Sequence, residues 1–281
     1  MLIMPFDPWQ SRWCTCPGKY SLSPYAGCSH GCLYCYAASY IPDFFTPRPK
    51  KDFLIRLKKD IFRIPAGALI AIANSSDPYQ PLEKTLRLTR ETLKIIAEKN
   101  LSLNLVTKSA LIARDCDIVK NMRCSAAITI TTLKPGLAKK LEPMAPAPQK
   151  RLAALEKLSK FIFTAVRLDP IIYGINEKEI DNIIMAAKNH GAKQIITSTY
   201  KAKPDNFKRL QTAFPAQAEG LKNLYLKNPH KISGQFYLEE NLRLKLVERC
   251  CTAALSAGLK FSSCREGFGQ LNTATCDGTV L

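Results

Sequence analysis

The chain has 281 residues, of which 46% are hydrophobic and 23% are charged. This composition excludes a disordered chain, and the length is sufficient for one large domain with a substantial core. Lysine and arginine number 41 against 23 acidic residues, a formal net charge of +18. Such an excess favours a polyanionic partner, most simply DNA or RNA, although a basic surface that serves only solubility would explain it as well.

The N-terminal residues and the apolar runs carry no targeting or membrane signal. The first ten residues lack a basic region and soon reach Pro5 and Pro8, so we expect no signal peptide. The longest apolar run, 68–73, is too short to cross a bilayer. We therefore expect a cytoplasmic protein with no membrane contact. In a reducing compartment, its 11 cysteines indicate metal binding or thiol chemistry rather than disulfides.

Strand and helix patterns alternate along the chain. The segment 48–63 combines seven cations with helical apolar spacing and predicts a basic amphipathic helix. Further strands are predicted at 67–76, 101–109, 124–132, 161–172 and 193–200, and helices at 82–100, 111–122, 147–160 and 176–192. About six strand–helix repeats predict an α/β fold with a parallel sheet. Residues 201–259 are mostly helical and rich in lysine, and the last 22 residues are rich in Gly, Ser and Thr.

Polar residues follow each predicted strand. The tokens are Asn-Ser-Ser-Asp at 74–77, Thr-Lys-Ser at 107–109, Thr-Ile-Thr-Thr at 129–132, Arg-Leu-Asp-Pro at 167–170 and Thr-Ser-Thr-Tyr at 197–200. Parallel β/α units place their functional residues at the carboxyl ends of the strands, so we expect the site there. Arg167 and Asp169 either pair with each other or contact a ligand.

Three cysteines lie in one short loop before the first repeat: Cys28, Cys32 and Cys35, in the stretch GCSHGCLYCYA. A structural zinc site needs four ligands, and the nearest later cysteine is Cys116, in a predicted helix. A [4Fe–4S] cluster on three thiolates would leave one iron open to a second molecule. We expect His30, inside the loop, to support this site by hydrogen bonding or packing rather than as a ligand.

The C-x3-C-x2-C spacing after a first strand resembles the radical SAM superfamily. The resemblance covers about residues 20–200 and implies a partial (β/α)6-type barrel. It also implies a [4Fe–4S] cluster on the three loop cysteines. S-adenosylmethionine (SAM) would bind the open iron and be cleaved to a 5′-deoxyadenosyl radical. We therefore divide the chain into an N-terminal extension at 1–19, a radical SAM core at 20–200 and a helical, Cys-containing C-terminal extension at 201–281 that packs on the barrel.

Within that superfamily, the loop and the ending SCREGF…TCDG resemble the spore photoproduct lyase-like branch. The resemblance implies that Tyr34 and Tyr36 pass a hydrogen atom and hold adenosine, although both rings could simply pack the loop. It also implies that Ser76 and Asp77 bind the amino group of SAM and that Lys108 binds its carboxylate. Thr129 is a weaker candidate for the carboxylate. Asp77 before proline is also typical of a turn, and Lys108 could be a surface lysine.

One position departs from the branch. The hydrogen-donor cysteine of the lyase corresponds to Asn74, which has no labile S–H bond. We therefore do not expect the lyase route of thymine-dimer repair. Cys116 and Cys124 remain alternative hydrogen donors.

The outer cysteines lie near both ends of the chain, at 14, 16, 264 and 276. If the ends pack together across the barrel mouth, the four thiols Cys14, Cys16, Cys264 and Cys276 form a second metal site for zinc or an iron–sulfur cluster. The alternative is four unrelated buried thiols.

These observations predict a radical SAM enzyme, either a lyase or a modifying enzyme. It needs a one-electron reductant of the flavodoxin or ferredoxin type and acts on nucleic acid, or on a protein or small molecule. The alternative is a non-enzymatic nucleic-acid-binding protein with a structural metal.

Overall fold

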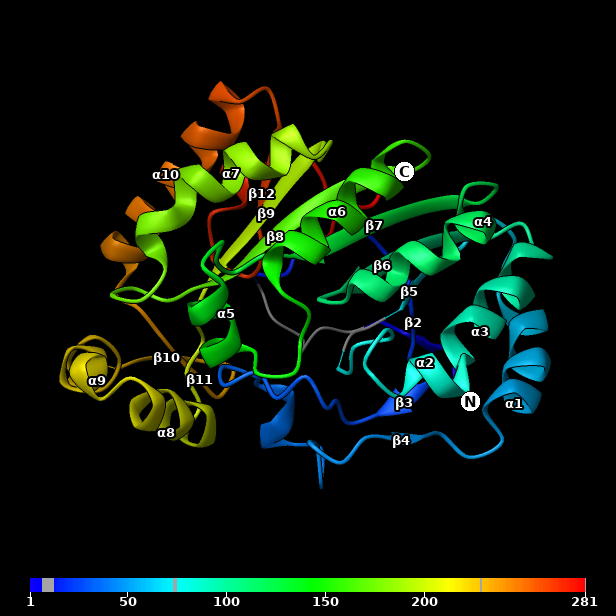
Figure 1. Ribbon diagram of the computed structural model, residues 1–281, viewed down its shortest axis with the longest axis horizontal. Helices are drawn as coiled ribbons and strands as arrows, with labels where there is room; N and C mark the ends of the chain where they lie inside the picture. Colours follow the sequence, from blue (N-terminus) through cyan, green and yellow to red (C-terminus); the bar gives the residue numbers. More distant parts are fainter. Residues whose placement is uncertain (7–12, 73–74, 228, 281) are drawn as a thin grey trace.

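The computed structural model describes residues 1–6, 13–72, 75–227 and 229–280. An eight-stranded open sheet forms its centre (Figure 1), in the order β1-β2-β5-β6-β7-β8-β9-β12. The strands are β1 Met4–Pro5, β2 Tyr20–Leu22, β5 Leu69–Ile72, β6 Ser102–Thr107, β7 Arg123–Thr129, β8 Phe163–Ile171, β9 Gln194–Thr199 and β12 Lys260–Ser263. All neighbours pair in parallel except β1 and β2, which are antiparallel.

Helices follow one another around the outside of the sheet. They are α3 Leu88–Ala97, α4 Cys116–Val119, α6 Pro148–Ser159, α7 Ile180–Asn189 and α10 Glu240–Ser256, with α1 Phe53–Asp60 beyond α3 (Figure 1). The strands have apolar residues on both faces, as parallel strands between two packed layers require. In β5, for example, all four residues are buried. Within the described residues, no helix has the length and apolar character needed to cross a membrane.

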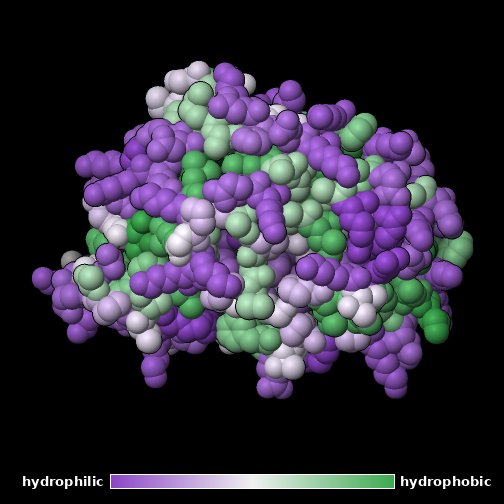
Figure 2. Space-filling view, in the orientation of Figure 1, coloured by the Kyte–Doolittle hydropathy of each residue, from purple (hydrophilic) through white to green (hydrophobic). Residues whose placement is uncertain are grey.

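The carboxyl ends of the strands are covered by shorter elements. These are the pair β3 Tyr25–Ala26 and β4 Arg48–Pro49, the pair β10 His230–Ile232 and β11 Gln235–Tyr237, and the helices α2 Glu83–Leu86, α5 Pro135–Leu141, α8 Pro204–Ala213 and α9 Pro215–Lys222. Short 3-10 turns and one π-helical turn complete the chain at 37–39, 61–63, 110–115, 177–179, 223–227 and 269–271. Figure 2 shows hydrophilic residues over most of one face, with hydrophobic residues only in separate patches.

The helix predicted over 82–100 is two helices, α2 and α3. Arg87 between them adopts a left-handed conformation with φ of 52°. The Glu83 carboxylate then accepts hydrogen bonds from the backbone N–H groups of Thr89 at 2.9 Å and Arg90 at 3.2 Å. These bonds satisfy the free donors at the start of α3. The chain therefore turns here, although the apolar spacing continues.

The C-terminal segment belongs to the sheet and its interior. β12, which the sequence pattern did not predict, pairs in parallel with β9. After β12 the chain enters the concave side of the sheet, where Gly278 lies against Ala165 and Ile196. A Cβ atom at Gly278, which has φ of +80°, would come within 3.1 Å of both side chains. Only glycine fits this place without rearrangement.

Candidate active site

A cavity of about 520 Å³ opens at the carboxyl ends of the parallel strands. This volume is within the usual range for small-molecule sites. The cavity is lined by every residue that the sequence assigned to the cluster or to SAM: Cys28, Cys32, Cys35, Tyr34, Tyr36, Ser76, Asp77, Lys108 and Thr129. The structure therefore brings these residues together, from a loop and the ends of three strands, in one place.

The three-cysteine loop starts at a glycine that its path requires. Gly27 has φ of +79°, and a Cβ there would lie 2.5 Å from the Phe44 carbonyl oxygen. The same carbonyl accepts the Cys28 backbone N–H at 2.7 Å. Gln80 closes the turn: its side chain donates to the Gly27 carbonyl and accepts from the Ser29 N–H, both at 3.1 Å. These contacts fix the conformation in which Cys28 faces the cavity.

Helix α8 holds the other end of the loop. Arg209 donates from Nε to the Leu33 carbonyl at 3.1 Å and from Nη2 to the Cys35 carbonyl at 2.9 Å. Asn206 donates to the Tyr34 carbonyl at 3.2 Å. Three consecutive backbone carbonyls of the loop are thus held by two side chains of one helix. No sequence pattern points to these residues, because they lie more than 170 positions further along the chain.

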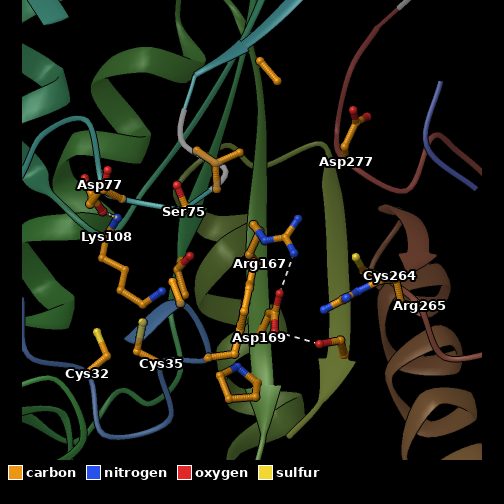
Figure 3. Close-up of a pocket in the computed structure, with 18 of the residues that line it drawn as sticks. Cys32, Cys35, Ser75, Asp77, Lys108, Arg167, Asp169, Cys264, Arg265 and Asp277 are labelled. Carbon is orange, nitrogen blue, oxygen red and sulfur yellow. Dashed lines mark hydrogen bonds and ion pairs between the residues drawn. The ribbon is translucent and has the colours of Figure 1, made fainter. Parts of the chain in front are cut away.

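The loop thiols lie beside a lysine. Figure 3 shows the Lys108 side chain extending toward Cys32 and Cys35 from the end of β6. Burial raises the pKa of both thiols, and the Lys108 ammonium opposes that shift by stabilising their thiolate forms. The Lys108 ammonium also lies over the Tyr34 ring, with Nζ 5.5 Å from the ring centroid. Lys108 is therefore a cavity residue and not a solvated surface lysine.

Asp77 joins the loop after β5 to the end of β6. Its carboxylate accepts hydrogen bonds from Thr107 Oγ1 at 2.6 Å, from the Lys108 N–H at 2.7 Å and from the Tyr79 N–H at 2.9 Å. His30 Nδ1 lies 3.4 Å from Asp77 Oδ2, an ion-pair distance without hydrogen-bond alignment. Burial opposes the charged form of Asp77, but His30 and these hydrogen bonds outweigh it and lower the pKa to about 2.

The two loop tyrosines differ in their surroundings. The Tyr34 hydroxyl donates to Glu142, a buried carboxylate that also pairs with Arg151 at 2.5 Å. The Tyr36 ring stacks on Tyr40 with centroids 6.4 Å apart. Tyr34 is therefore anchored in the protein by its polar end, whereas Tyr36 presents its ring at the cavity wall.

Charged side chains line the wall opposite the loop. Arg167 pairs with Asp169 at 2.5 Å, and Ser198 donates to the same carboxylate at 2.7 Å (Figure 3). Of the two possibilities for Arg167 and Asp169, the structure therefore shows their pairing. Arg265, a residue with φ of +55°, points to the same region, and its guanidinium lies 5.7 Å from the Tyr36 ring centroid. Within the described residues Arg265 forms no ion pair.

The loop cysteines and most of the strand ends of this site lie in a part of the chain that matches a known family profile. The family profile described as the radical SAM superfamily matches residues 22–187, more than half of the chain. The chain belongs to the radical SAM superfamily. Membership implies an enzyme that uses a [4Fe–4S] cluster and SAM, and the parallel α/β sheet agrees with the fold that the sequence predicted.

Several relatives and solved structures resemble this radical SAM protein. "Uncharacterized protein MJ0683" of Methanocaldococcus jannaschii is 33% identical over 147 residues, which cover 50% of this chain and 56% of that protein. "Uncharacterized protein Rv2578c" of Mycobacterium tuberculosis is 27% identical over 155 residues, 50% of this chain and 45% of that protein. The chain thus spans about half the length of the curated relatives it matches.

Among structures, a spore photoproduct lyase double mutant with bound AdoMet and dinucleoside spore photoproduct has a TM-score of 0.70 at 15% identity. The match covers 91% of this chain and 79% of the lyase chain. Streptococcus suis SuiB bound to the precursor peptide SuiA has a TM-score of 0.53 at 12% identity. That match covers 86% of this chain and 48% of the SuiB chain. At these identities, the likeness shows the radical SAM fold.

In this radical SAM protein, the serine that faces the cavity is Ser75 and not Ser76, which the sequence had suggested. Ser76 is buried and donates to the Tyr25 carbonyl at 2.8 Å, so its hydroxyl is engaged in the wall. Ser75 points into the cavity instead (Figure 3). Adjacent positions in a tight turn can face different ways, and spacing alone does not choose between them. Asn74, where the branch has a cysteine, lies outside the described residues.

The alternative hydrogen donors lie away from the cavity. Cys124 is at the amino end of β7, the end opposite the site, and Cys116 is at the start of α4 on the outside of the sheet. Neither lines the cavity. A thiol there cannot reach a group bound among the loop cysteines, so the structure argues against both as hydrogen donors.

The outer cysteines reach the same cavity. Cys14, Cys16, Cys264 and Cys276 all line it, and the Sγ atoms of Cys16 and Cys276 are 3.2 Å apart. The prediction that the chain ends bring thiols together is therefore confirmed for this pair. Across the described residues, however, no three Cys, His, Asp or Glu side chains are placed to hold one metal ion. The second metal site stays a prediction without support from this arrangement.

Proposed function

We propose that this protein holds a [4Fe–4S] cluster through Cys28, Cys32 and Cys35 and uses it to cleave SAM reductively. One observation carries the proposal: three thiols of a single loop line one cavity together with the residues expected to bind SAM. Thiolates on separate corners of a cluster stand further apart than the ligands of one ion. The absence of a single-ion ligand group among the described residues is therefore compatible with a cluster and disfavours a zinc site.

The donor set fits the cluster chemically. Thiolates are the ligands that iron–sulfur clusters prefer, and Lys108 provides a positive charge beside two of them. When bound, the cluster supplies the electron that breaks the sulfonium S–C5′ bond of SAM and yields a 5′-deoxyadenosyl radical. The protein supplies binding, orientation and exclusion of water.

The residues of this chain divide that work among them. Lys108, a cation with no competing acidic partner at its ammonium among the described ion pairs, binds the SAM carboxylate. Asp77 accepts the Lys108 N–H and so holds the end of β6 that carries Lys108, and Ser75 and Thr129 offer hydroxyls to the amino acid end of SAM. The Tyr36 ring at the cavity wall provides a surface for adenine. Tyr34, whose hydroxyl is bound to Glu142, positions the loop.

The substrate that we propose is nucleic acid, DNA or RNA, acted on as a lyase or modifying enzyme. Two cations lie over aromatic rings of the cavity wall: Arg265 over Tyr36 at 5.7 Å and Lys203 over Tyr40 at 5.6 Å. Rings that stack bases beside cations that neutralise phosphates are typical of single-stranded nucleic acid sites. The net charge of +18 supports the same class. The electron donor would be a flavodoxin or ferredoxin type protein.

Anaerobic reconstitution tests the proposal. The wild-type protein should take up about four irons per chain and form 5′-deoxyadenosine when given dithionite and SAM. Cys32→Ala should abolish both, whereas Cys124→Ala, a matched change outside the cavity, should abolish neither. A colourless protein that binds one zinc and makes no 5′-deoxyadenosine would establish the alternative, a nucleic-acid-binding protein with a structural metal.

A further inference from the structure

The thiols of Cys16 and Cys276 meet from opposite ends of the chain. Their Sγ atoms are 3.2 Å apart, with Cys276 as the donor. At this separation the two thiols are in direct contact, within reach of an S–H···S hydrogen bond.

Cys276 is held in place by hydrogen bonds between its turn and the sheet. Cys276 is almost fully buried in a tight turn in which Thr275 Oγ1 donates to the Thr279 carbonyl at 2.6 Å. Gln194 of β9 donates to the Thr275 carbonyl at 2.7 Å, and Asn104 of β6 donates to the Asp277 carbonyl at 3.2 Å. Cys276 is therefore anchored to two central strands of the sheet.

Lys19 links the two segments electrostatically. It forms a buried ion pair with Asp277, the residue after Cys276, and lies three positions after Cys16. Hydrogen bonds from the Cys14 and Cys276 thiols, together with the positive charge of Lys19, lower the pKa of the Cys16 thiol. The hydrogen bond to Cys16 and burial raise the pKa of the Cys276 thiol. The pair is thus two thiols in direct contact beside a buried cation, the geometry that thiol–disulfide exchange requires.

We propose that Cys16 and Cys276 are a redox-active dithiol that exchanges with low-molecular-weight disulfides and closes to a reversible disulfide at the wall of the cavity. The inference does not depend on the proposed cluster. In the first step, the Cys16 thiolate attacks a sulfur of the small disulfide, and one thiolate leaves. In the second, Cys276 loses its proton and attacks the Cys16 sulfur of the mixed disulfide, and the second thiolate leaves. The small disulfide gains two electrons, which the cysteine pair loses.

The bond would join segments 260 positions apart. It would tie the segment before β2, at one edge of the sheet, to the tail that packs inside it. Both sulfurs line the cavity that also contains the three loop cysteines, so the redox state of the pair changes the wall of the candidate active site. Cross-links that close long loops restrict the unfolded chain most.

The test is equilibration of the full-length protein in glutathione redox buffers, followed by acid quenching, alkylation and tryptic mass mapping. Trypsin separates residues 13–19, which contain Cys14 and Cys16, from 266–281, which contain Cys276, and from 20–50, which contain the loop cysteines. We expect a linked pair of peptides 13–19 and 266–281, with fragmentation placing the bond at Cys16. Oxidation should raise the thermal midpoint by several degrees in the wild type and in Cys124→Ser, but not in Cys16→Ser or Cys276→Ser.

Three results would overturn the dithiol. The first is a Cys14–Cys16 bond with Cys276 free. The second is failure of the two peptides to link at any buffer ratio that oxidises other thiols of the chain. The third is metal binding: zinc or iron retained when Cys28, Cys32 and Cys35 are all replaced by alanine and lost on adding Cys276→Ser. Loss of the reconstituted cluster in Cys32→Ala would leave the dithiol result unchanged, so the two proposals fail separately.

Discussion

At the scale of single residues, Asp77 is the side chain whose chemistry is best defined. Its carboxylate accepts three hydrogen bonds, one from Tyr79 in the loop after β5 and two from Thr107 and Lys108 at the end of β6. Asp77→Asn preserves the shape but turns an N–H₂ group toward backbone donors, so buried groups lose their acceptor. We expect a loss of about 1–3 kcal/mol in the free energy of unfolding and weaker SAM binding. Urea denaturation and equilibrium dialysis measure the two effects.

Asp117→Asn is the matched control for that substitution. Asp117 is a largely exposed carboxylate paired with Arg90 at 2.6 Å, and exposed pairs contribute about 0–1 kcal/mol. An equal loss of stability in both variants would contradict the stabilising role of the three hydrogen bonds that Asp77 accepts.

The charge of Asp77 also gives its contribution a defined pH dependence. The ordinary pKa of 3.8 falls to about 2 in the folded protein, so the folded state binds the proton more weakly than the unfolded state. The stability from the charged form is therefore complete above about pH 4 and is lost as pH falls through about 2. We expect the difference in unfolding free energy between wild type and Asp77→Asn to shrink over that interval. A difference that stays constant from pH 5 to pH 2 would exclude the shift.

At the scale of elements, helix α8 is the support of the cysteine loop. Arg209 binds two loop carbonyls, and its removal would leave them without donors. We expect Arg209→Met to fold normally, as judged by circular dichroism, yet to retain several-fold less iron than wild type after anaerobic reconstitution. Lys208→Met, the neighbouring exposed cation on the same helix, controls for loss of charge and should retain wild-type iron. Equal iron in Arg209→Met and wild type would show that the loop holds its shape without α8.

The sequence predicts some elements well and others poorly, for physical reasons. The long strands β6 to β9 were predicted because runs of buried apolar residues are a strong signal. β1 was missed because it has only two residues. β12 was missed because Phe261 is its only apolar residue, whereas the equally short β5 is apolar throughout. The three loop cysteines follow from spacing and soft-ligand chemistry. Ser75 and Arg209 do not, because the direction of a side chain in a turn and a contact across the chain are tertiary properties.

At the scale of the whole molecule, the predicted division at residue 200 can be compared with the contacts that cross it. β12 hydrogen-bonds to β9 along four residue pairs, and Gly278 packs between Ala165 and Ile196. Glu266 accepts hydrogen bonds from the Thr199 N–H at 2.9 Å and from the Thr199 hydroxyl at 3.0 Å. The later segment therefore supplies an outer strand, part of the interior and hydrogen-bond acceptors to the earlier one.

We expect residues 20–200 expressed alone not to fold cooperatively. Removal of the rest exposes one edge of β9, opens the alanine-lined interior and leaves the carbonyls of the cysteine loop unsatisfied, and each of these losses is destabilising. The measurement is a comparison of urea unfolding and of amide proton dispersion between 20–200 and the full chain. Adding residues 201–281 as a separate polypeptide should restore the transition in part, because the interface is specific. A sharp unfolding transition in 20–200 alone would show that the radical SAM core is an autonomous domain and that the later segment only packs on it.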